Sequence, residues 1–371
     1  MKVMHVVPSF GFGGMEKVLC SIINGLPSMY QHEILALDNR ISANKWIKNP
    51  NVKILSFCKP KKNIKFFVAL YKVLKISKPD ILMTYNWGAT DAVWLGRLVG
   101  ISNIFHNEHG FNVDEAGRTQ WKRNAVRFVV YRLARRVIVV SRELKEMMQC
   151  SFYLNGNHVV FIPNGLDFSI YSPDFNVRQK IRTNLGIRDC DTLVGFIGRL
   201  DAVKNLPLML KAFVACIRKD PTFKLLIVGE GSERSHVEAI CRDESIVQHV
   251  LLIGHNDDVL PYLRALDIFL LTSLREQMPM SLLEAMAVGV PIVASAVGEI
   301  PNMVEDGKEG FLCQPDDSAQ EWATRLLLLA DPQRQQVMSR AARRKVVKRF
   351  ELRAMLSAYQ KLFLHSERAV Q

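Results

Sequence analysis

The stretch 271–295, LTSLREQMPMSLLEAMAVGVPIVAS, contains the end of one strand, a turn, a helix and the start of the next strand. Glu276 lies in the turn, Pro279 suits the first turn of a helix, and Glu284 falls in the second helical turn. The helix is otherwise almost entirely apolar, and a lone carboxylate in a buried helix requires a hydrogen-bond partner. The two carboxylates are therefore candidates for binding a ligand beside a parallel sheet.

The same alternation of short apolar runs and helical patterns extends along the chain. Seven apolar runs lie between Val3 and Ile162, and after residues 162–174, IPNGLDFSIYSPD, six more lie between Leu193 and Leu312. Such alternation predicts an α/β protein with two Rossmann-like, doubly wound parallel sheets. We expect one domain over residues 1–170, a second over 171–350, and ligand in a cleft between the carboxyl edges of their sheets.

The end of the chain reads as helix from about residue 331 onward. The part at 351–371 is expected to pack back on the first domain, as the resemblance described below implies. The first domain would then be built from both ends of the sequence.

The composition of the 371 residues excludes several classes of protein. The seven cysteines are scattered and form no C-x-x-C pair, which argues against a disulfide framework and against a zinc site. No apolar run approaches the ~18 residues that span a bilayer, and the N-terminus reads directly into a strand without a secretory signal. We therefore expect a cytoplasmic protein.

Positive charge is concentrated in the first half. Lys and Arg exceed Asp and Glu by 12 in residues 1–170 and by 1 in residues 171–371. The segment 59–78 carries seven lysines around an apolar stripe, and 121–136 adds Lys122, Arg123, Arg127, Arg132, Arg135 and Arg136. Core helices with outward basic residues would attract an anionic membrane surface. Nucleic acid is not expected, because no groove-reading or base-stacking motif accompanies the charge.

A glycine-rich turn lies at residues 8–19, PSFGFGGMEKVL, between the first strand and a helix that begins near Met15. The backbone amides of Gly13 and Gly14 could meet an anion at the positive end of that helix. The alternatives are an NAD site, with Asp38 at the end of the second strand, and a tight turn that is structural only. Glu16 occupies the position of the third glycine of G-x-G-x-x-G, which disfavours a pyrophosphate there.

The second half opens with GFIGRLDAVKN, residues 195–205, in which a strand leads into a loop with Arg199 and Lys204. Two cations fixed at this edge of the sheet could hold a diphosphate without a metal ion. The alternative is that both are solvated surface charges.

In combination these motifs resemble the E-x7-E retaining glycosyltransferases of family 4, which have the GT-B fold. The resemblance is carried by Glu276 and Glu284, by the upstream Arg199 and Lys204, by IPNGLD at 162–167 and by GEIPNMVEDGKEGFL at 298–312. It implies that residues 1–170 form the acceptor side and that residues 171–350 bind a nucleotide sugar. Gln277, Glu299 and Asn302 depart from the residues common in the family, so the identity of the sugar stays open.

The resemblance also implies roles for individual residues. Arg199 and Lys204 would contact the diphosphate and Glu284 the ribose, while Glu276 and the backbone of 277–280 would contact the sugar and phosphate. His109, in FHNEHG, matches a cleft histidine that approaches the donor sugar. The expected catalytic residues are Glu276, His109, Arg199 and Lys204. The expected donor-binding residues are Gly13, Gly14, Arg199, Lys204, Gly254, Gln277, Met278, Pro279, Met280 and Glu284.

Two segments resemble metal-binding motifs, but neither is expected to bind a metal ion. His106 and His109 lie three residues apart but lack the helix and the third ligand that zinc needs. The sequence DCD at 189–191 precedes a strand instead of following one, so we interpret it as a turn.

We therefore expect a metal-independent, retaining hexosyltransferase without a cofactor, located on the inner face of the cytoplasmic membrane. Its donor would be a UDP-sugar in preference to a GDP-sugar, and its acceptor a hydroxyl of a glycan or lipid-linked glycan of polysaccharide or lipopolysaccharide synthesis. The alternatives are a catalytically silent GT-B subunit that binds a partner, and an NAD-dependent oxidoreductase.

Overall fold

The computed structural model describes residues 1–57, 63–110 and 121–367. The chain divides into two compact units, an N-terminal unit of residues 1–165 with 352–371 and a C-terminal unit of residues 166–351. The first boundary thus lies a few residues before the expected position near 170. The segment 59–62 of the predicted basic stretch lies outside the described residues.

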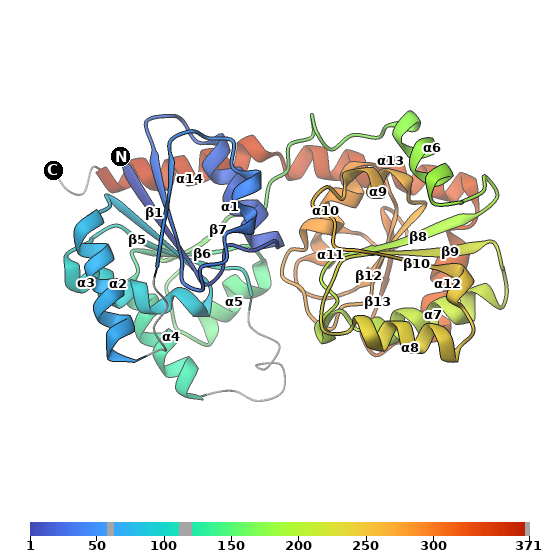
Figure 1. Ribbon diagram of the computed structural model, residues 1–371, viewed down its shortest axis with the longest axis horizontal. Coiled ribbons are helices and arrows are strands. Elements are labelled where there is room, and N and C mark those ends of the chain that lie inside the picture. Colours follow the sequence, from blue (N-terminus) through green and yellow to red (C-terminus); the bar gives the residue numbers. More distant parts are fainter. Residues whose placement is uncertain (58–62, 111–120, 368–371) are drawn as a thin grey trace. The chain divides into compact units, whose positions relative to one another are not determined.

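The N-terminal unit is built on a seven-stranded parallel sheet of order β3-β2-β1-β4-β5-β6-β7 (Figure 1). Its strands are β1 (Lys2–Val7), β2 (Gln31–Ala36), β3 (Val52–Leu55), β4 (Ile81–Tyr85), β5 (Ile104–Glu108), β6 (Arg136–Val139) and β7 (Val159–Phe161). Its helices are α1 (Gly14–Gly25), η1 (Ser42–Trp46), α2 (Ile64–Ser77), η2 (Trp87–Ala89), α3 (Thr90–Val99), α4 (Trp121–Leu133), α5 (Arg142–Cys150) and α14 (Leu352–Glu367).

The C-terminal unit contains a six-stranded parallel sheet of order β10-β9-β8-β11-β12-β13. Its strands are β8 (Thr192–Ile197), β9 (Phe223–Val228), β10 (Val250–Gly254), β11 (Ile268–Leu271), β12 (Ile292–Ser295) and β13 (Gly310–Cys313). Its helices are α6 (Phe175–Asn184), η4 (Ala202–Lys204), α7 (Leu206–Ile217), α8 (Arg234–Asp243), η5 (Val247–His249), α9 (Leu260–Ala265), α10 (Met280–Ala287), α11 (Ile300–Met303), α12 (Ala319–Leu328) and α13 (Pro332–Arg349). The predicted α/β class with two parallel sheets is confirmed.

The central strands β4, β5, β11 and β12 are buried along their whole length, so their sequences do not alternate between apolar and polar residues as a strand with one solvent-facing side would. The edge strands β3, β7 and β10 are only partly buried. In β11, for example, every residue of IFLL is buried. Helix starts follow the local capping residues: the Ser141 side chain accepts from Leu144 N, and Ser318 and Glu321 form a reciprocal capping box.

The helical end of the chain, expected from about residue 331 onward, consists of two helices. Helix α13 stops at Arg349, Phe350 leaves the helical region with φ −129° and ψ 37°, and α14 begins at Leu352. In the N-terminal unit α14 runs beside α1, the Tyr359 hydroxyl donates to Asn107 Oδ1 at 3.0 Å, and the Phe363 ring contacts Tyr30. Burial of Phe350 and of Phe363 accompanies this break.

No helix in the described part of the chain is both long and apolar enough to cross a membrane.

A buried ion-pair network organises the C-terminal unit around Asp267, the residue before β11. Its carboxylate accepts from both Arg178 and Arg182 of α6 and from the backbone N of Leu193 in β8 at 2.7 Å. Arg182 is 7% exposed and Asp267 is 9% exposed, so water cannot replace this carboxylate as a counter-charge.

We expect Asp267→Asn to lower the free energy of unfolding by about 3 to 5 kcal/mol, because Arg182 would be left buried without its counter-charge. Urea unfolding followed by circular dichroism measures this change. The exposed Asp243, at the end of α8, provides the control variant Asp243→Asn, which should stay close to the parent. Equal midpoints for the two variants would contradict the structural role assigned to Asp267.

Candidate functional site

The C-terminal sheet changes winding direction between β8 and β11. These strands are hydrogen-bonded neighbours, although β9 and β10 come between them in the sequence. In open parallel sheets, ligands bind outside the carboxyl ends of the two strands at such a switch point. The loop after β8 carries Arg199 and Lys204, and the loop after β11 carries Glu276. The topology therefore brings these predicted residues to one edge.

Lys204 and Glu276 form an ion pair at this edge. The distance from Lys204 Nζ to Glu276 Oε1 is 2.5 Å, and the Ser273 hydroxyl donates to the same carboxylate oxygen at 2.7 Å. The two charged side chains are 16% and 10% exposed, so each stabilises the other where water has little access. Both bonds use Oε1, which leaves Oε2 without a partner among the residues that the structure describes. This pairing was not predicted: Lys204 was expected to contact the diphosphate, and Glu276 the sugar and phosphate.

Backbone contacts fasten the two loops to each other. The Thr272 hydroxyl donates to the carbonyl of Lys204 at 2.9 Å, and Leu274 N donates to the carbonyl of Val203 at 2.8 Å. The ion pair thus connects loops whose backbones are already held together. This limits the movement that would separate its charges.

Gly298 and Glu299, after β12, support the turn that carries Glu276. Gly298 has φ +59°, and a Cβ placed on it would lie 1.8 Å from the carbonyl oxygen of Glu276. Glu299 N donates to the carbonyl of Gln277 at 2.8 Å. The positioning role of Gly298 and Glu299 was not predicted; the sequence signal for it is a glycine three residues after a buried strand.

Helix α10 begins at Met280, and Pro279 is its N-cap instead of lying in its first turn. Met278, Pro279 and Met280 are buried, so side-chain burial fixes the start of this helix. Glu284 in the second turn is 2% exposed and accepts from the Tyr171 hydroxyl at 3.4 Å. The expected need for a partner is therefore met in part by Tyr171, a residue that the sequence did not single out.

Arg199 differs from the expectation of two fixed cations. Its guanidinium lies 3.1 Å from Asp201 Oδ2, but its side chain is 73% exposed. An exposed pair of this kind contributes little stability and is screened by salt, so the side chain is free to change its rotamer. Only Lys204 is held rigidly.

Gly254, another predicted donor contact, ends β10 at the same edge of the sheet. Its carbonyl accepts from Gly229 N at 2.8 Å, and Gly198 N donates to Val228 O at 3.1 Å. These bonds join the ends of β8, β9 and β10. Gly229 was not predicted, although it follows a buried strand as Gly198 does.

The N-terminal sheet has its own switch point between β1 and β4. Gly13 caps α1, and the Glu16 carboxylate lies where a Cβ on Gly13 would be, with Oε2 only 2.4 Å from that position. This carboxylate stabilises the helix start electrostatically and would repel a phosphate bound there. Asp38 accepts from Arg40 Nε at 2.6 Å, so it is engaged at the position where a ribose would be read in an NAD site.

His109 follows β5 at this edge and is half-buried. Its backbone N donates to Asn86 Oδ1 at 2.7 Å, and its ring stacks on Tyr85 with centroids 6.2 Å apart. Burial lowers the pKa of His109 to about 4, with a further lowering by His106 and an opposing effect of Glu108. The imidazole is therefore neutral near pH 7 and can both donate and accept a hydrogen bond.

His106 belongs to the interior and not to a metal site with His109. Its Nδ1 lies 2.8 Å from the Thr84 hydroxyl, and the side chain is fully buried. In the DCD turn, Asp191 is held by Arg188. Within residues 1–57, 63–110 and 121–367 no three His, Cys, Asp or Glu side chains are grouped to hold a metal ion.

One of the basic residues that were predicted to face outward from helices α2 and α4 is buried instead. In α2, Phe66, Leu70 and Leu74 are buried, as a helix docked on the sheet requires. In α4, Arg127 was expected to face outward but is 2% exposed, with its guanidinium 5.1 Å from the centre of the Trp87 ring. Arg127 is an interior cation that packs on an aromatic ring, and it adds nothing to an outer basic face.

Comparison with known proteins identifies the family. Residues 12–169 match Glycosyltransferase Family 4, and residues 177–345 match Glycosyl transferases group 1. The chain is 27% identical over 315 residues to UDP-Gal:alpha-D-GlcNAc-diphosphoundecaprenol alpha-1,3-galactosyltransferase of Escherichia coli, over 82% of this chain and 80% of that protein. It is 28% identical to N-acetyl-alpha-D-glucosaminyl L-malate synthase of Bacillus anthracis over 69% of this chain and 66% of that protein.

Among solved structures, Anabaena HepE in complex with UDP and glucose superposes with a TM-score of 0.84 at 20% identity, covering 97% of this chain and 98% of that one. This likeness shows the fold. The two family matches together extend from residue 12 to residue 345 with one short gap. The chain therefore belongs to the family 4 glycosyltransferases and has their GT-B fold of two Rossmann-like domains.

Proposed function

We propose that this glycosyltransferase moves a hexose unit from a UDP-sugar to a hydroxyl of a glycan or lipid-linked glycan, with retention of anomeric configuration. We infer the position of the donor site from the ion pair between Lys204 and Glu276 at the switch point of the C-terminal sheet. The E. coli relative is named for a UDP-Gal donor and a diphosphoundecaprenol-linked acceptor, and HepE was solved with UDP. Both names support UDP over GDP.

The diphosphate would be held by the two cations after β8. Lys204 supplies an ammonium group in a fixed position. The exposed Arg199 can change its rotamer so that two guanidinium N–H groups donate to the diphosphate. The start of α10 adds backbone amides and the positive end of the helix dipole. These groups would stabilise negative charge on the leaving diphosphate, and they would do so without a metal ion.

The sugar and ribose would be bound by the carboxylates. Glu276 Oε2 is available for a sugar hydroxyl while Oε1 stays with Lys204 and Ser273. Glu284 would accept from the ribose hydroxyls beside Tyr171. His109, neutral near pH 7, would donate to or accept from the sugar. Gln277, Met278, Pro279, Met280 and Gly254 complete the proposed donor contacts.

We also infer attachment to an anionic membrane surface. Trp121 is 71% exposed and Val129 is 55% exposed on α4, beside Lys122 and Arg132. Exposed apolar side chains next to basic ones suit the boundary between lipid headgroups and acyl chains. The acceptor would then be presented at that surface.

Arg199→Ala should weaken UDP binding by about tenfold or more, since one charge-assisted contact to the diphosphate is lost. Thermal-shift titrations with UDP, GDP, ADP and NAD measure this. Arg218→Ala is the matched control, because Arg218 is also 73% exposed and pairs with a carboxylate, Glu244. A thermal shift with NAD that is the same in the parent and in Arg199→Ala, or no thermal shift with any nucleotide, would contradict the proposal.

Glu276→Gln should lower kcat/KM by about 10- to 100-fold, because the sugar loses a charged acceptor. The matched control is Glu309→Gln, which breaks a similarly buried pair with Lys345 in the same unit. Both variants should lose stability, whereas only Glu276→Gln should lose transfer. Loss of transfer in both to the same degree would show that Glu276 is structural only.

Proton NMR of the product anomer in the same assay tests retention.

Transfer should be unchanged by EDTA, because fixed cations of the chain are proposed to neutralise the leaving diphosphate. The assay is UDP release with and without chelator. Activity that disappears with EDTA and returns with Mg²⁺ or Mn²⁺ would overturn the metal-independent part of the proposal and leave the donor assignment standing.

A further inference from the structure

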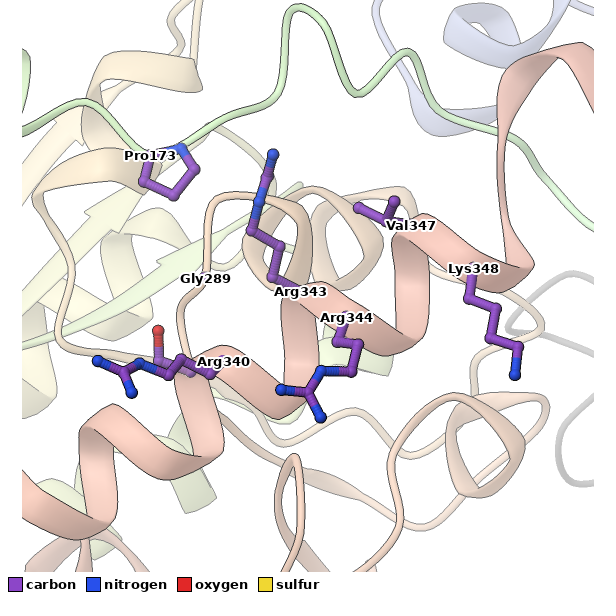
Figure 2. Close-up of a pocket in the computed structure, with 8 residues that line it drawn as sticks. Pro173, Gly289, Arg340, Arg343, Arg344, Val347 and Lys348 are labelled. Atoms are coloured by element: carbon purple, nitrogen blue, oxygen red, sulfur yellow. The ribbon is translucent and has the colours of Figure 1, made fainter.

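A pocket of about 620 Å³ lies along α13 in the C-terminal unit (Figure 2). Two neighbouring rows of side chains, each spaced by four residues, form one side of it: Ser339, Arg343 and Val347, and Arg340, Arg344 and Lys348. Pro173 and Gly289 lie on the other side. The volume is in the range of small-molecule sites, which is about 300 to 1,000 Å³.

Four of the eight residues that line the pocket are basic. Helix α13 carries seven Lys and Arg residues and no Asp or Glu. Two of the seven are engaged away from the pocket: Lys345 pairs with Glu309 at 2.9 Å, and Arg349 donates to Asn302 O at 3.2 Å. The four that line the pocket are Arg340, Arg343, Arg344 and Lys348, and no carboxylate lines it with them.

Arg343 forms one edge of the pocket and donates hydrogen bonds to backbone carbonyl groups. Its guanidinium donates to Tyr171 O at 3.0 Å and to the carbonyl of Ala287, the last residue of α10. Figure 2 shows it extending toward the segment of Pro173. Burial lowers the pKa of Arg343, as expected for a cation whose partners are carbonyls instead of a carboxylate.

The other three cations extend from the opposite side of α13 in this view (Figure 2). Arg340, Arg344 and Lys348 are exposed, and none has a hydrogen-bonding or ionic partner among the residues that the structure describes. Like charges four residues apart on a helix repel each other. An anion bridging them would convert this repulsion into attraction.

Gly289 lets the chain on the other side of the pocket lie near α13 without a side chain that would fill the pocket. It has φ +81°, and a Cβ there would lie 3.1 Å from the Ser339 hydroxyl. A side chain at this position would be strained by the backbone and would press on α13. Glycine therefore lets the end of α10 approach α13 without filling the space above it.

We propose that this pocket binds the phosphate of a small anionic ligand. Arg340 and Arg344 would each offer a planar pair of donors, with Lys348 as a point charge and Ser339 as a hydroxyl donor. Val347 and Pro173 would contact the uncharged remainder of the ligand. None of the residues proposed for the donor site lines this pocket, although Arg343 and Glu284 both contact Tyr171.

Two probes test this proposal with the full chain at constant salt. Isothermal titration calorimetry measures the binding of inorganic pyrophosphate. Co-sedimentation measures binding to phosphatidylcholine vesicles prepared with and without phosphatidic acid. Arg344→Gln should weaken binding of at least one probe by about tenfold or more. Its control is Arg334→Gln, with the same charge change on the same helix outside the pocket, which should bind as the parent does.

Because the two variants have equal net charge, their difference reports on this pocket whatever binds elsewhere. Arg344-dependent binding of pyrophosphate would support the proposal with a soluble phosphorylated ligand, and Arg344-dependent binding of vesicles would support it with a lipid headgroup. Equal affinity of the two variants for both probes would overturn it. Arg344 is exposed, so both variants should fold, and their unfolding midpoints verify this.

Discussion

The contact between Lys204 and Glu276 is the interaction on which the organisation of the C-terminal unit's site depends. It unites two loops that the chain order keeps far apart, at the point where the sheet reverses its winding. A largely buried ammonium needs a carboxylate nearby, and a largely buried carboxylate needs a cation. The pair therefore fixes two charged groups at once, and Gly298 and Glu299 contact the backbone of the turn that carries Glu276.

Helix α10 links this site to the rest of the unit. Its start lies next to the ion pair, its second turn carries Glu284, and its last carbonyl is held by Arg343 from α13. Tyr171 contributes at two places, with its hydroxyl on Glu284 and its carbonyl on Arg343. A short, almost wholly buried helix is thus positioned by polar contacts at both ends and by apolar packing between.

The sequence was sufficient for the fold and for the main residues of the candidate site, but not for their pairing. Apolar runs mark buried parallel strands directly, because both faces of such strands are covered. The motif spacing selected Arg199, Lys204, Glu276 and Glu284, and whether they bind a donor remains a prediction. That Lys204 would be fixed and Arg199 exposed depends on Asp201, Ser273 and Thr272, whose side-chain positions no spacing reveals. The burial of Arg127 and the break at Phe350 are likewise decided by tertiary packing.

The discontinuity of the N-terminal unit has a consequence for how the protein is made. Residues 166–351 form one uninterrupted segment, whereas the N-terminal unit needs α14 from beyond it, with Tyr359 bonded to Asn107 and Phe363 against Tyr30. Helix α14 is translated after the whole of residues 166–351, so the N-terminal unit cannot complete its contacts before the C-terminal unit has been synthesised.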